Sequence, residues 1–361
     1  MKLTSYLLFL ALINSAHGAL FSSPPTHIKG KASLEAISVD DLQTEARVVS
    51  FSVFADIKQT VLPHLEASVI AGGVLETGSN ESLFVDEFKP RQDLVLKEAS
   101  LSYSPIEALQ IEAGALNQSR YDSPLLLTET PFVSARESIN FKLADYSFGL
   151  FLSQAVPSNH FLTNRLGSVD EGAPSLLIEG ITMHLAGDLM FFKTQIMRFK
   201  FNNLSSNVAY NSQFLGNSTR GVSPSTTAFL YDYEGYNIVM EMGFNIGESS
   251  SLIFNGQYLY NDKAPDGRNT GYLASLTLEM GQLRLTGSYF TNESDSSPAF
   301  YNSSTYGHND REGQGIELAW MIPTEATSLY LKAYKLDTNQ QILQSDSSRF
   351  YAGITRSFSF D

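Results

Sequence analysis

The sequence of 361 residues contains no cysteine and a single tryptophan, and charged residues make up only 17% of it. Without cysteine, neither a disulfide framework nor a thiolate metal site can hold the fold together. The net charge of −14 excludes nucleic acid as an expected partner, because phosphate backbones attract basic proteins. Beyond the N-terminus no segment approaches 18 consecutive apolar residues, which excludes membrane-spanning helices.

The N-terminus holds the most apolar stretch of the chain. A short basic start precedes the apolar run at residues 6–13, and Ala16 and Gly18 stand at the −3 and −1 positions of a cleavage site. This order is typical of a secretory signal peptide, and the run is too short to span a membrane as a helix. We therefore predict that residues 1–18 are removed and that residues 19–361 form the mature chain.

Aromatic residues are plentiful, with 24 Phe and 17 Tyr, and many lie in runs where apolar and polar side chains alternate. Ile238, Met240 and Met242, for example, alternate with Asn237 and Glu241. A period of two predicts β-strands with one apolar and one polar face. We count about 16 such runs, at 26–37, 46–59, 64–77, 93–103, 107–117, 137–143, 147–156, 175–186, 189–202, 236–246, 250–262, 270–280, 282–292, 313–322, 326–337 and 349–361.

The connections between these runs alternate between short and long. Short turns are expected near 60–63, 104–107, 144–146, 187–188, 247–249, 280–282 and 322–326. Longer polar connections are expected near 38–45, 78–92, 118–136, 157–174, 203–235, 263–269, 293–312 and 338–346. A soluble β-sandwich has no reason to place all its long loops at one end, whereas a transmembrane β-barrel does.

The predicted fold is therefore all-β, a single-domain transmembrane antiparallel β-barrel with short periplasmic turns and long extracellular loops. Lipid leaves no water to satisfy backbone N–H and C=O groups, so a spanning sheet must close on itself. Strands of about 9 to 11 residues cross the membrane when tilted, and most of the runs are that long. In 189–202 charged residues fall on mixed faces, which predicts a β-bulge there.

The last run resembles the C-terminal assembly signal of bacterial outer-membrane proteins. In that signal a final aromatic residue follows alternating apolar ones, here Ala352, Ile354, Phe358 and Phe360. The sequence departs from the pattern at Arg356, which lies in the lipid-facing phase and can extend its charge to an interface. The resemblance implies that the last strand closes the barrel against the first.

One hairpin carries a second resemblance. The segment EASLSYSP at 98–105, followed by LQIEAG at 109–114, is similar to a hairpin of the phosphate-selective and related outer-membrane porins. The lumenal Arg and Lys cluster of that family has no counterpart here, so only the general porin interpretation carries over. It implies a water-filled channel for passive diffusion of small hydrophilic solutes and ions in the outer membrane of a Gram-negative cell, surrounded by its lipid, as a homotrimer without cofactor.

The resemblance also implies that the third long connection, residues 117–137, folds into the barrel. Its leucine triplet at 125–127 suits contact with an inner wall, although packing at the barrel mouth or in a subunit interface is the alternative. Charges of both signs in a narrow pore bias ion passage. The candidate constriction residues are Arg120, Asp122, Glu129 and Arg136.

The polar faces of the strands supply candidate pore-lining residues, namely Lys29, Lys31, Glu35, Glu66, Glu98, Glu112, Lys142, Glu279, Arg284 and Glu317. On these faces the acids outnumber the bases by nine to six when Lys58, Lys332, Asp56, Glu76 and Glu241 are included. This excess predicts a mild cation preference. The alternative is that many of the charges pair across strands and leave little net field.

Catalytic signatures are absent from the sequence: it has no HExxH, G-x-S-x-G, P-loop or GxGxxG motif, and no cofactor or metal is expected. His308 with Asp310, or His160, could serve an outer-membrane enzyme only if the fold assembled them. A second alternative is an adhesion or binding barrel, in which the loops 203–235 and 293–312 engage a partner while the lumen is plugged. A soluble exported β-protein is the alternative at the level of the fold.

Overall fold

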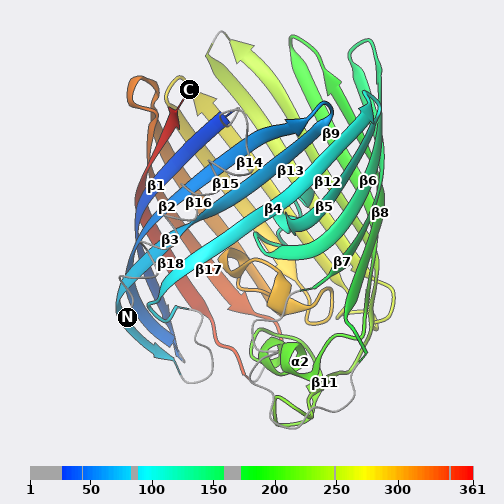
Figure 1. Ribbon diagram of the computed structural model, residues 1–361. Helices are drawn as coiled ribbons and strands as arrows, with labels where there is room; N and C mark the ends of the chain where they lie inside the picture. Colours follow the sequence, from blue (N-terminus) through cyan, green and yellow to red (C-terminus); the bar gives the residue numbers. More distant parts are fainter. Residues whose placement is uncertain are drawn as a thin grey trace, which may run out of the picture.

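The computed structural model describes residues 27–42, 44–82, 88–157, 172–247, 249–340 and 343–360 (Figure 1). Within these residues sixteen strands pair edge to edge into one closed antiparallel barrel. They are β1 (His27–Asp41), β2 (Thr44–Leu62), β3 (Leu65–Ser82), β4 (Gln92–Ile106), β5 (Leu109–Asn117), β6 (Pro131–Leu143), β7 (Tyr146–Val156), β8 (Ser175–Ala186), β9 (Met190–Asn202), β12 (Tyr233–Gly247), β13 (Ser250–Asn261), β14 (Thr270–Met280), β15 (Leu283–Asn292), β16 (Arg311–Ile322), β17 (Thr327–Thr338) and β18 (Ser347–Phe360). The signal peptide expected at 1–18 lies outside the described residues.

The barrel closes where β1 pairs with β18. Their register runs from Ile28 beside Phe360 to Asp41 beside Ser347. The backbone groups of the last strand therefore find partners on the first strand, as a sheet without access to water requires. The all-β barrel fold, its strand number and the closing role of the last strand are confirmed.

Each run of alternating residues corresponds to one barrel strand, but two details of the prediction are wrong. The connection expected at 38–45 is a short turn, because β1 continues to Asp41 and β2 begins at Thr44. The bulge expected within 189–202 is absent, because β9 pairs with β8 and with β12 without a register shift. The mixed charges there result from strict alternation, with Lys193 facing inward and Arg198 outward.

Alternation gives the barrel an apolar outer wall and a polar inner wall. Outward-facing Leu276, Ile316 and Leu331 are 44%, 56% and 47% exposed. Their chain neighbours Ser275 and Lys332 face cavities inside the barrel instead. Large apolar side chains this exposed would be unfavourable in water and suit a lipid environment.

Tight turns join the strands at the upper end of Figure 1, which we call the turn side, and longer segments at the lower end, the loop side. Between β9 and β12 the loop side carries the helix α2 (Ser206–Gln213) and a small sheet of β10 (Thr219–Arg220) and β11 (Ala228–Phe229). Ser205 caps α2, because its Oγ accepts a hydrogen bond from the Val208 N–H at 3.3 Å. Among the described residues, no helix is long and apolar enough to cross a membrane.

Substitution on the two walls should have unequal effects. Leu276→Arg places a guanidinium on the outer wall and should lower the free energy of unfolding in lipid vesicles by about 2–4 kcal/mol. Ser275→Arg is the matched control, because the adjacent side chain faces an interior cavity, and its effect should stay within about 1 kcal/mol. Denaturant-induced unfolding in vesicles measures both, and equal effects would contradict the assignment of the two faces.

Candidate functional site

The inner loop, residues 118–130, joins β5 to β6 and turns into the barrel. It starts with the 3-10 helix η1 (Gln118–Tyr121), which is capped because the Asn117 side chain accepts a hydrogen bond from the Ser119 N–H at 3.0 Å. Asp122 ends this helix in the left-handed region, with φ of 49°, which Asp adopts more readily than most residues. The cap and this backbone reversal together redirect the chain toward the lumen.

Three leucines carry the inner loop to the opposite wall. Leu125, Leu126 and Leu127 are at most 1% exposed. The Leu125 N–H donates to Oε1 of Gln257 at 3.2 Å, and Nε2 of Gln257 donates to Oγ of Ser123 at 2.8 Å. Gln257 belongs to β13, five strands beyond β6 around the barrel. The loop therefore lies inside the barrel and not over its rim.

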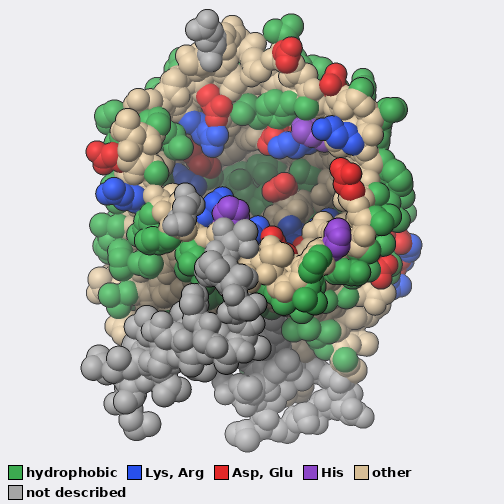
Figure 2. Space-filling model, turned by 45° about the horizontal axis from the view of Figure 1, so that its top comes forward, with side chains coloured by type: hydrophobic (Ala, Val, Ile, Leu, Met, Phe, Trp, Pro, Cys, Tyr) green, Lys and Arg blue, Asp and Glu red, His purple; other side chains and the backbone are tan. Residues whose placement is uncertain are grey.

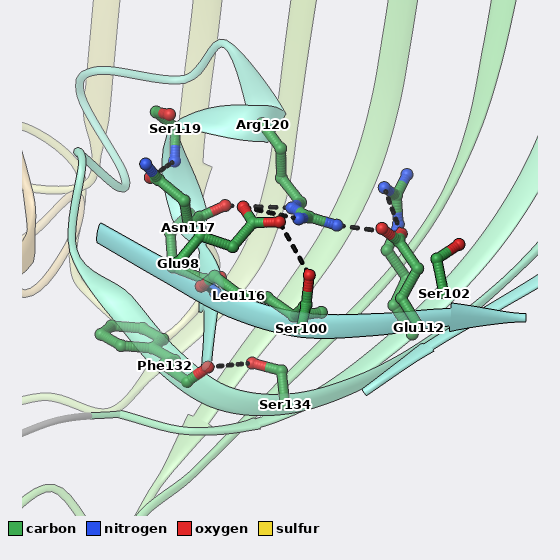
Figure 3. A network of polar contacts seen from close by, with 12 residues as sticks. Glu98, Ser100, Ser102, Glu112, Leu116, Asn117, Ser119, Arg120, Phe132 and Ser134 are labelled. Atoms are coloured by element: carbon green, nitrogen blue, oxygen red, sulfur yellow. Dashed lines mark hydrogen bonds and ion pairs between the residues drawn. The ribbon is translucent and has the colours of Figure 1, made fainter. Parts of the chain in front are cut away.

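Arg120 fastens the start of the inner loop to the wall (Figure 3). Its Nη1 lies 2.9 Å from Oε2 of Glu112, and its Nη2 lies 3.3 Å from Oε2 of Glu98. Its Nε donates to the carbonyl of Asn117 at 3.0 Å. Arg136 adds a second cation, with Nη1 3.6 Å from Glu112. These charged side chains are only 13–19% exposed, so water screens their interaction weakly. The fold thus brings two candidate constriction residues and two candidate wall residues into one network.

The other two candidate constriction residues lie apart from this network. Glu129 forms an ion pair with Lys97 of β4. Asp122 lines a cavity that also contains Lys193 and Glu241. Burial raises the pKa of Asp122, and the Glu241 carboxylate raises it further.

Lys97 is an interior residue that strand alternation does not reveal. The register between β3 and β4 shifts between Ile70 and Ala71, which leaves one extra residue in β4. Lys97 occupies this position and faces the interior together with its neighbour Glu98. Because a bulge depends on the partner strand, the β4 segment alone carries no signal for it.

The loop-side half of the interior is filled. The cap loop, residues 293–310, joins β15 to β16 and packs on the inner loop, where the Thr128 N–H donates to the Tyr301 carbonyl at 2.9 Å. The ring of Tyr301 meets that of Phe132 edge to face, with centroids 5.2 Å apart. This buried cluster continues with Tyr121, Leu125, Leu126, Leu127, Phe151, Phe199, Phe201, Tyr233 and Phe290.

Buried amides hold the cap loop in place. Nδ2 of Asn309 donates to the carbonyls of Ser294 and Ser297 at 3.0 and 2.7 Å, and its Oδ1 accepts from Nδ2 of Asn292 at 2.7 Å. Asn217, from the segment between β9 and β12, donates to the same two carbonyls. A buried network with its groups satisfied favours one arrangement, because each displaced amide would lose its partners.

Two cavities adjoin the inner loop on the turn side of this filled region. The larger, about 690 Å³, is bounded by β1, β2 and β15 to β18 and by Lys97 and Glu129. The other, about 470 Å³, is bounded by the inner loop and by β8, β9 and β12 to β14. Figure 2 shows the hollowed turn-side mouth, with basic and acidic side chains around it.

All ten candidate pore-lining residues lie on the inward-facing side of their strands: Lys29, Lys31, Glu35, Glu66, Glu98, Glu112, Lys142, Glu279, Arg284 and Glu317. Several of the acids pair with bases outside the nine-to-six count. Arg120 pairs with Glu98 and Glu112, and Nζ of Lys193 lies 2.8 Å from Glu241. The excess of acids over bases counted from the sequence is therefore smaller once these ion pairs are included.

His308, one of the two histidines considered for catalysis, is a packing residue in the described part of the chain. No group of three or more His, Asp or Glu among the described residues could hold a metal ion. Nδ1 of His308 lies 3.0 Å from the Ala299 carbonyl and 2.9 Å from Oδ1 of Asn302, so this histidine belongs to the packing of the cap loop. His160, the other histidine considered, lies outside the described residues.

No protein-family model matches the sequence, and no curated protein matches it. Solved structures do match the barrel. OccK5 (OpdH) of Pseudomonas aeruginosa has a TM-score of 0.51 at 8% identity, covering 93% of this chain and 98% of its own. The outer membrane protein OprD of the same organism has a TM-score of 0.50 at 10% identity, covering 92% and 94%. The closed sixteen-stranded barrel of the described residues shares its fold with these two proteins. Within this fold, the inner loop and its two flanking cavities are the candidate functional site.

Removing the Arg120 side chain should release the start of the inner loop. Arg120→Ala leaves the weakly exposed Glu98 and Glu112 with fewer cationic partners, and we expect a loss of about 3–5 kcal/mol in unfolding free energy. Arg47→Ala is the control, because that arginine pairs with Asp40 at 3.7 Å on a half-exposed surface and should contribute about 1 kcal/mol or less. Similar losses in the two variants, measured by denaturant titration, would contradict the clamp.

Asp310 should make the cap loop sensitive to pH. Burial raises its pKa to about 6, although the Gln340 N–H and Arg311 both act to lower it. The folded value exceeds the unfolded value of about 3.9, so the stabilisation is complete below pH 4 and is lost as pH rises through 6. Hydrogen exchange of residues 293–310, corrected for intrinsic rate, should be faster at pH 7.5 than at pH 5.

Asp310→Asn should remove this pH dependence, because the amide stays neutral and tolerates the left-handed backbone at this position. Asp337→Asn, which removes a half-exposed carboxylate from the outer rim, is the matched control and should keep it. An unchanged pH dependence in Asp310→Asn would show that another group controls the cap loop.

Proposed function

We propose that this chain is a porin of the bacterial outer membrane that lets small hydrophilic solutes and ions diffuse passively. The supporting observation is the pair of cavities, about 690 and 470 Å³, that flank the inner loop inside the barrel and are both lined in part by charged side chains. Pore radius and wall charge determine passage in such a channel, and no bond is made or broken. The apolar outer wall would face membrane lipid, and the signal peptide at 1–18 would direct export.

The inner loop is the proposed constriction. Arg120 and Arg136 hold its base against Glu98 and Glu112, while Glu129 reaches the larger cavity beside Lys97. The charged groups at the narrowest part would then come from the loop and from the wall. This arrangement suits a transverse field, with fixed charges of both signs across a short distance.

We further propose that charge selectivity is weak and set by the turn-side mouth. A cation preference follows from counting acids, but it requires that those acids be unpaired. The described structure pairs Glu279, Glu317 and Glu129 with bases, whereas Lys29 and Lys31 form no ion pair with another described residue. Beside the larger cavity Lys31 is offset by Glu35, whose carboxylate accepts a hydrogen bond from the Tyr330 hydroxyl and has no ion-pair partner among the described residues, so neither sign of charge dominates there.

A binding barrel is the second candidate function. The observation that favours it is the filled loop-side half of the interior, where the cap loop and the inner loop pack around Tyr301 and Phe132. In that case the loops would engage a surface partner, and the barrel would conduct nothing.

Conductance in planar bilayers separates the two candidates. The porin should give stepwise openings, and a salt gradient should give only a small reversal potential, as weak charge selectivity requires. Lys31→Glu should shift this potential toward cations, because it reverses an unpaired charge at the larger cavity. Lys335→Glu, on the outer rim, is the matched control and should leave it unchanged. A folded barrel without openings would favour the binding barrel.

A further inference from the structure

Two rows of inward-facing side chains, contributed by the same five strands, form the wall of the smaller cavity. This cavity of about 470 Å³ lies against β8, β9, β12, β13 and β14. The register aligns one row across these strands, formed by Leu273, Gln257, Val239, Gln195 and Thr182. Alternate residues of a strand share a face, so the next inward residues form a second row, one step nearer the turn side on each strand. Its members are Ser275, Asn255, Glu241, Lys193 and His184.

The row nearer the loop side gives the cavity an apolar surface. Leu273 belongs to the buried hydrophobic cluster of the barrel, and Val239 packs against that cluster. Pro124 of the inner loop and Tyr306 of the cap loop line the same cavity. The amide of Gln257 already bonds the inner loop through both its oxygen and its nitrogen. This end of the cavity therefore offers a ligand apolar contact more than hydrogen bonds.

The row nearer the turn side carries the charge of the cavity. Nζ of Lys193 lies 2.8 Å from Oε1 of Glu241, so these two residues form an ion pair. Asp122 of the inner loop lines the same cavity and forms no ion pair with another described residue. The charged side chains of the lining are thus two acids and one base, with His184 as the neutral titratable neighbour. The smaller cavity has an excess of one negative charge.

The backbone fixes the position of the Asp122 carboxylate. The Asp122 N–H donates to the Ser119 carbonyl at 3.0 Å, and its φ of 49° is in the left-handed region. Burial raises the pKa of Asp122, the Glu241 carboxylate raises it further, and Lys193 lowers it. A cation between the two carboxylates would relieve their repulsion and accept the charge that Lys193 alone does not balance. An ammonium or guanidinium group would also form charge-assisted hydrogen bonds there.

We propose that the smaller cavity binds an organic cation, with its ammonium or guanidinium group between Asp122 and Glu241 and a compact apolar body against Val239 and Leu273. A hydrated inorganic cation would leave the apolar row without a partner. The cavity volume of about 470 Å³ lies within the range of small-molecule sites. The larger cavity is bordered mainly by hydroxyl-bearing and charged side chains and lacks such an apolar row. The inference rests on the proposed channel function and names a class of solute for it.

Isothermal titration calorimetry of the full-length protein, folded in a nonionic detergent, tests this site. The probe is phenethylammonium, which has a cationic head and an aromatic body. Hydrocinnamate carries the same ring with a carboxylate, and ethylammonium carries the cationic head without the ring. Phenethylammonium should bind with a Kd at least about tenfold lower than either compound. Titration into micelles without protein supplies the blank for partition into detergent.

Removing the charge of Asp122 should weaken this binding. Asp122→Asn should raise the Kd of phenethylammonium about tenfold, and asparagine tolerates the left-handed backbone, so the inner loop keeps its conformation. Asp145→Asn is the matched control, because this exposed aspartate lies in the turn between β6 and β7 and does not line the cavity. Its Kd should stay within about twofold of the parent value.

A second variant tests the apolar part of the site. Val239→Thr keeps the branched shape and suits a β-strand, but it places a hydroxyl against the ligand body. The Kd of phenethylammonium should rise about threefold or more, whereas ethylammonium, which does not reach this row, should bind as before.

Four results would overturn the site: no binding above the micelle blank, equal binding of hydrocinnamate, an unchanged Kd in Asp122→Asn, or an unchanged Kd in Val239→Thr. Channel conductance is measured separately in planar bilayers. A barrel that conducts but does not bind phenethylammonium contradicts this inference alone. A barrel that binds it but does not conduct contradicts the porin proposal and leaves the site in place.

Discussion

Backbone hydrogen bonding is the constraint on which the rest of this structure depends. A sheet in lipid cannot leave an edge, so β1 must pair with β18 over its whole length. Closure makes every strand two-faced, with Leu276 outside and Ser275 inside as one example. It also leaves a wide interior that the wall side chains of a sixteen-stranded barrel cannot fill. The loops must therefore determine whether that interior conducts.

The loops meet this requirement by forming a hydrophobic core inside the barrel. Leu125, Leu126 and Leu127 of the inner loop are buried against rings that the wall and the cap loop contribute. Buried amides such as Asn309 then fix the cap loop on the inner loop. The dry region occupies the loop side and the charged cavities the turn side, so a solute path would pass beside the inner loop. The segments that stabilise the interior are thus the ones that would border such a path.

Much of the fold could be predicted from the sequence, because a period of two is visible within one segment. Features that depend on how one strand pairs with another could not be predicted from the sequence. The bulge that turns Lys97 inward arises from the register of β4 on β3, and the bulge expected in β9 is absent for the same kind of reason. Arg120 could be assigned to the lumen from its loop, but its contacts with Glu98 and Glu112 require the folded backbone. Counting charges likewise overstates the field, since it ignores which of them pair.

On the outer wall, some charged side chains occupy positions where the alternation predicts apolar ones. Several charges depart from its apolar phase, and two of them, Arg356 and Glu137, differ in position. Arg356 lies four residues from the end of β18, where a long side chain can carry its charge to the interface. Glu137 lies midway along β6 with apolar neighbours on every side and has a shorter side chain. The first position is compatible with lipid alone. The second position gives the charge no route to water along the wall, because its neighbours on β5, β6 and β7 are apolar.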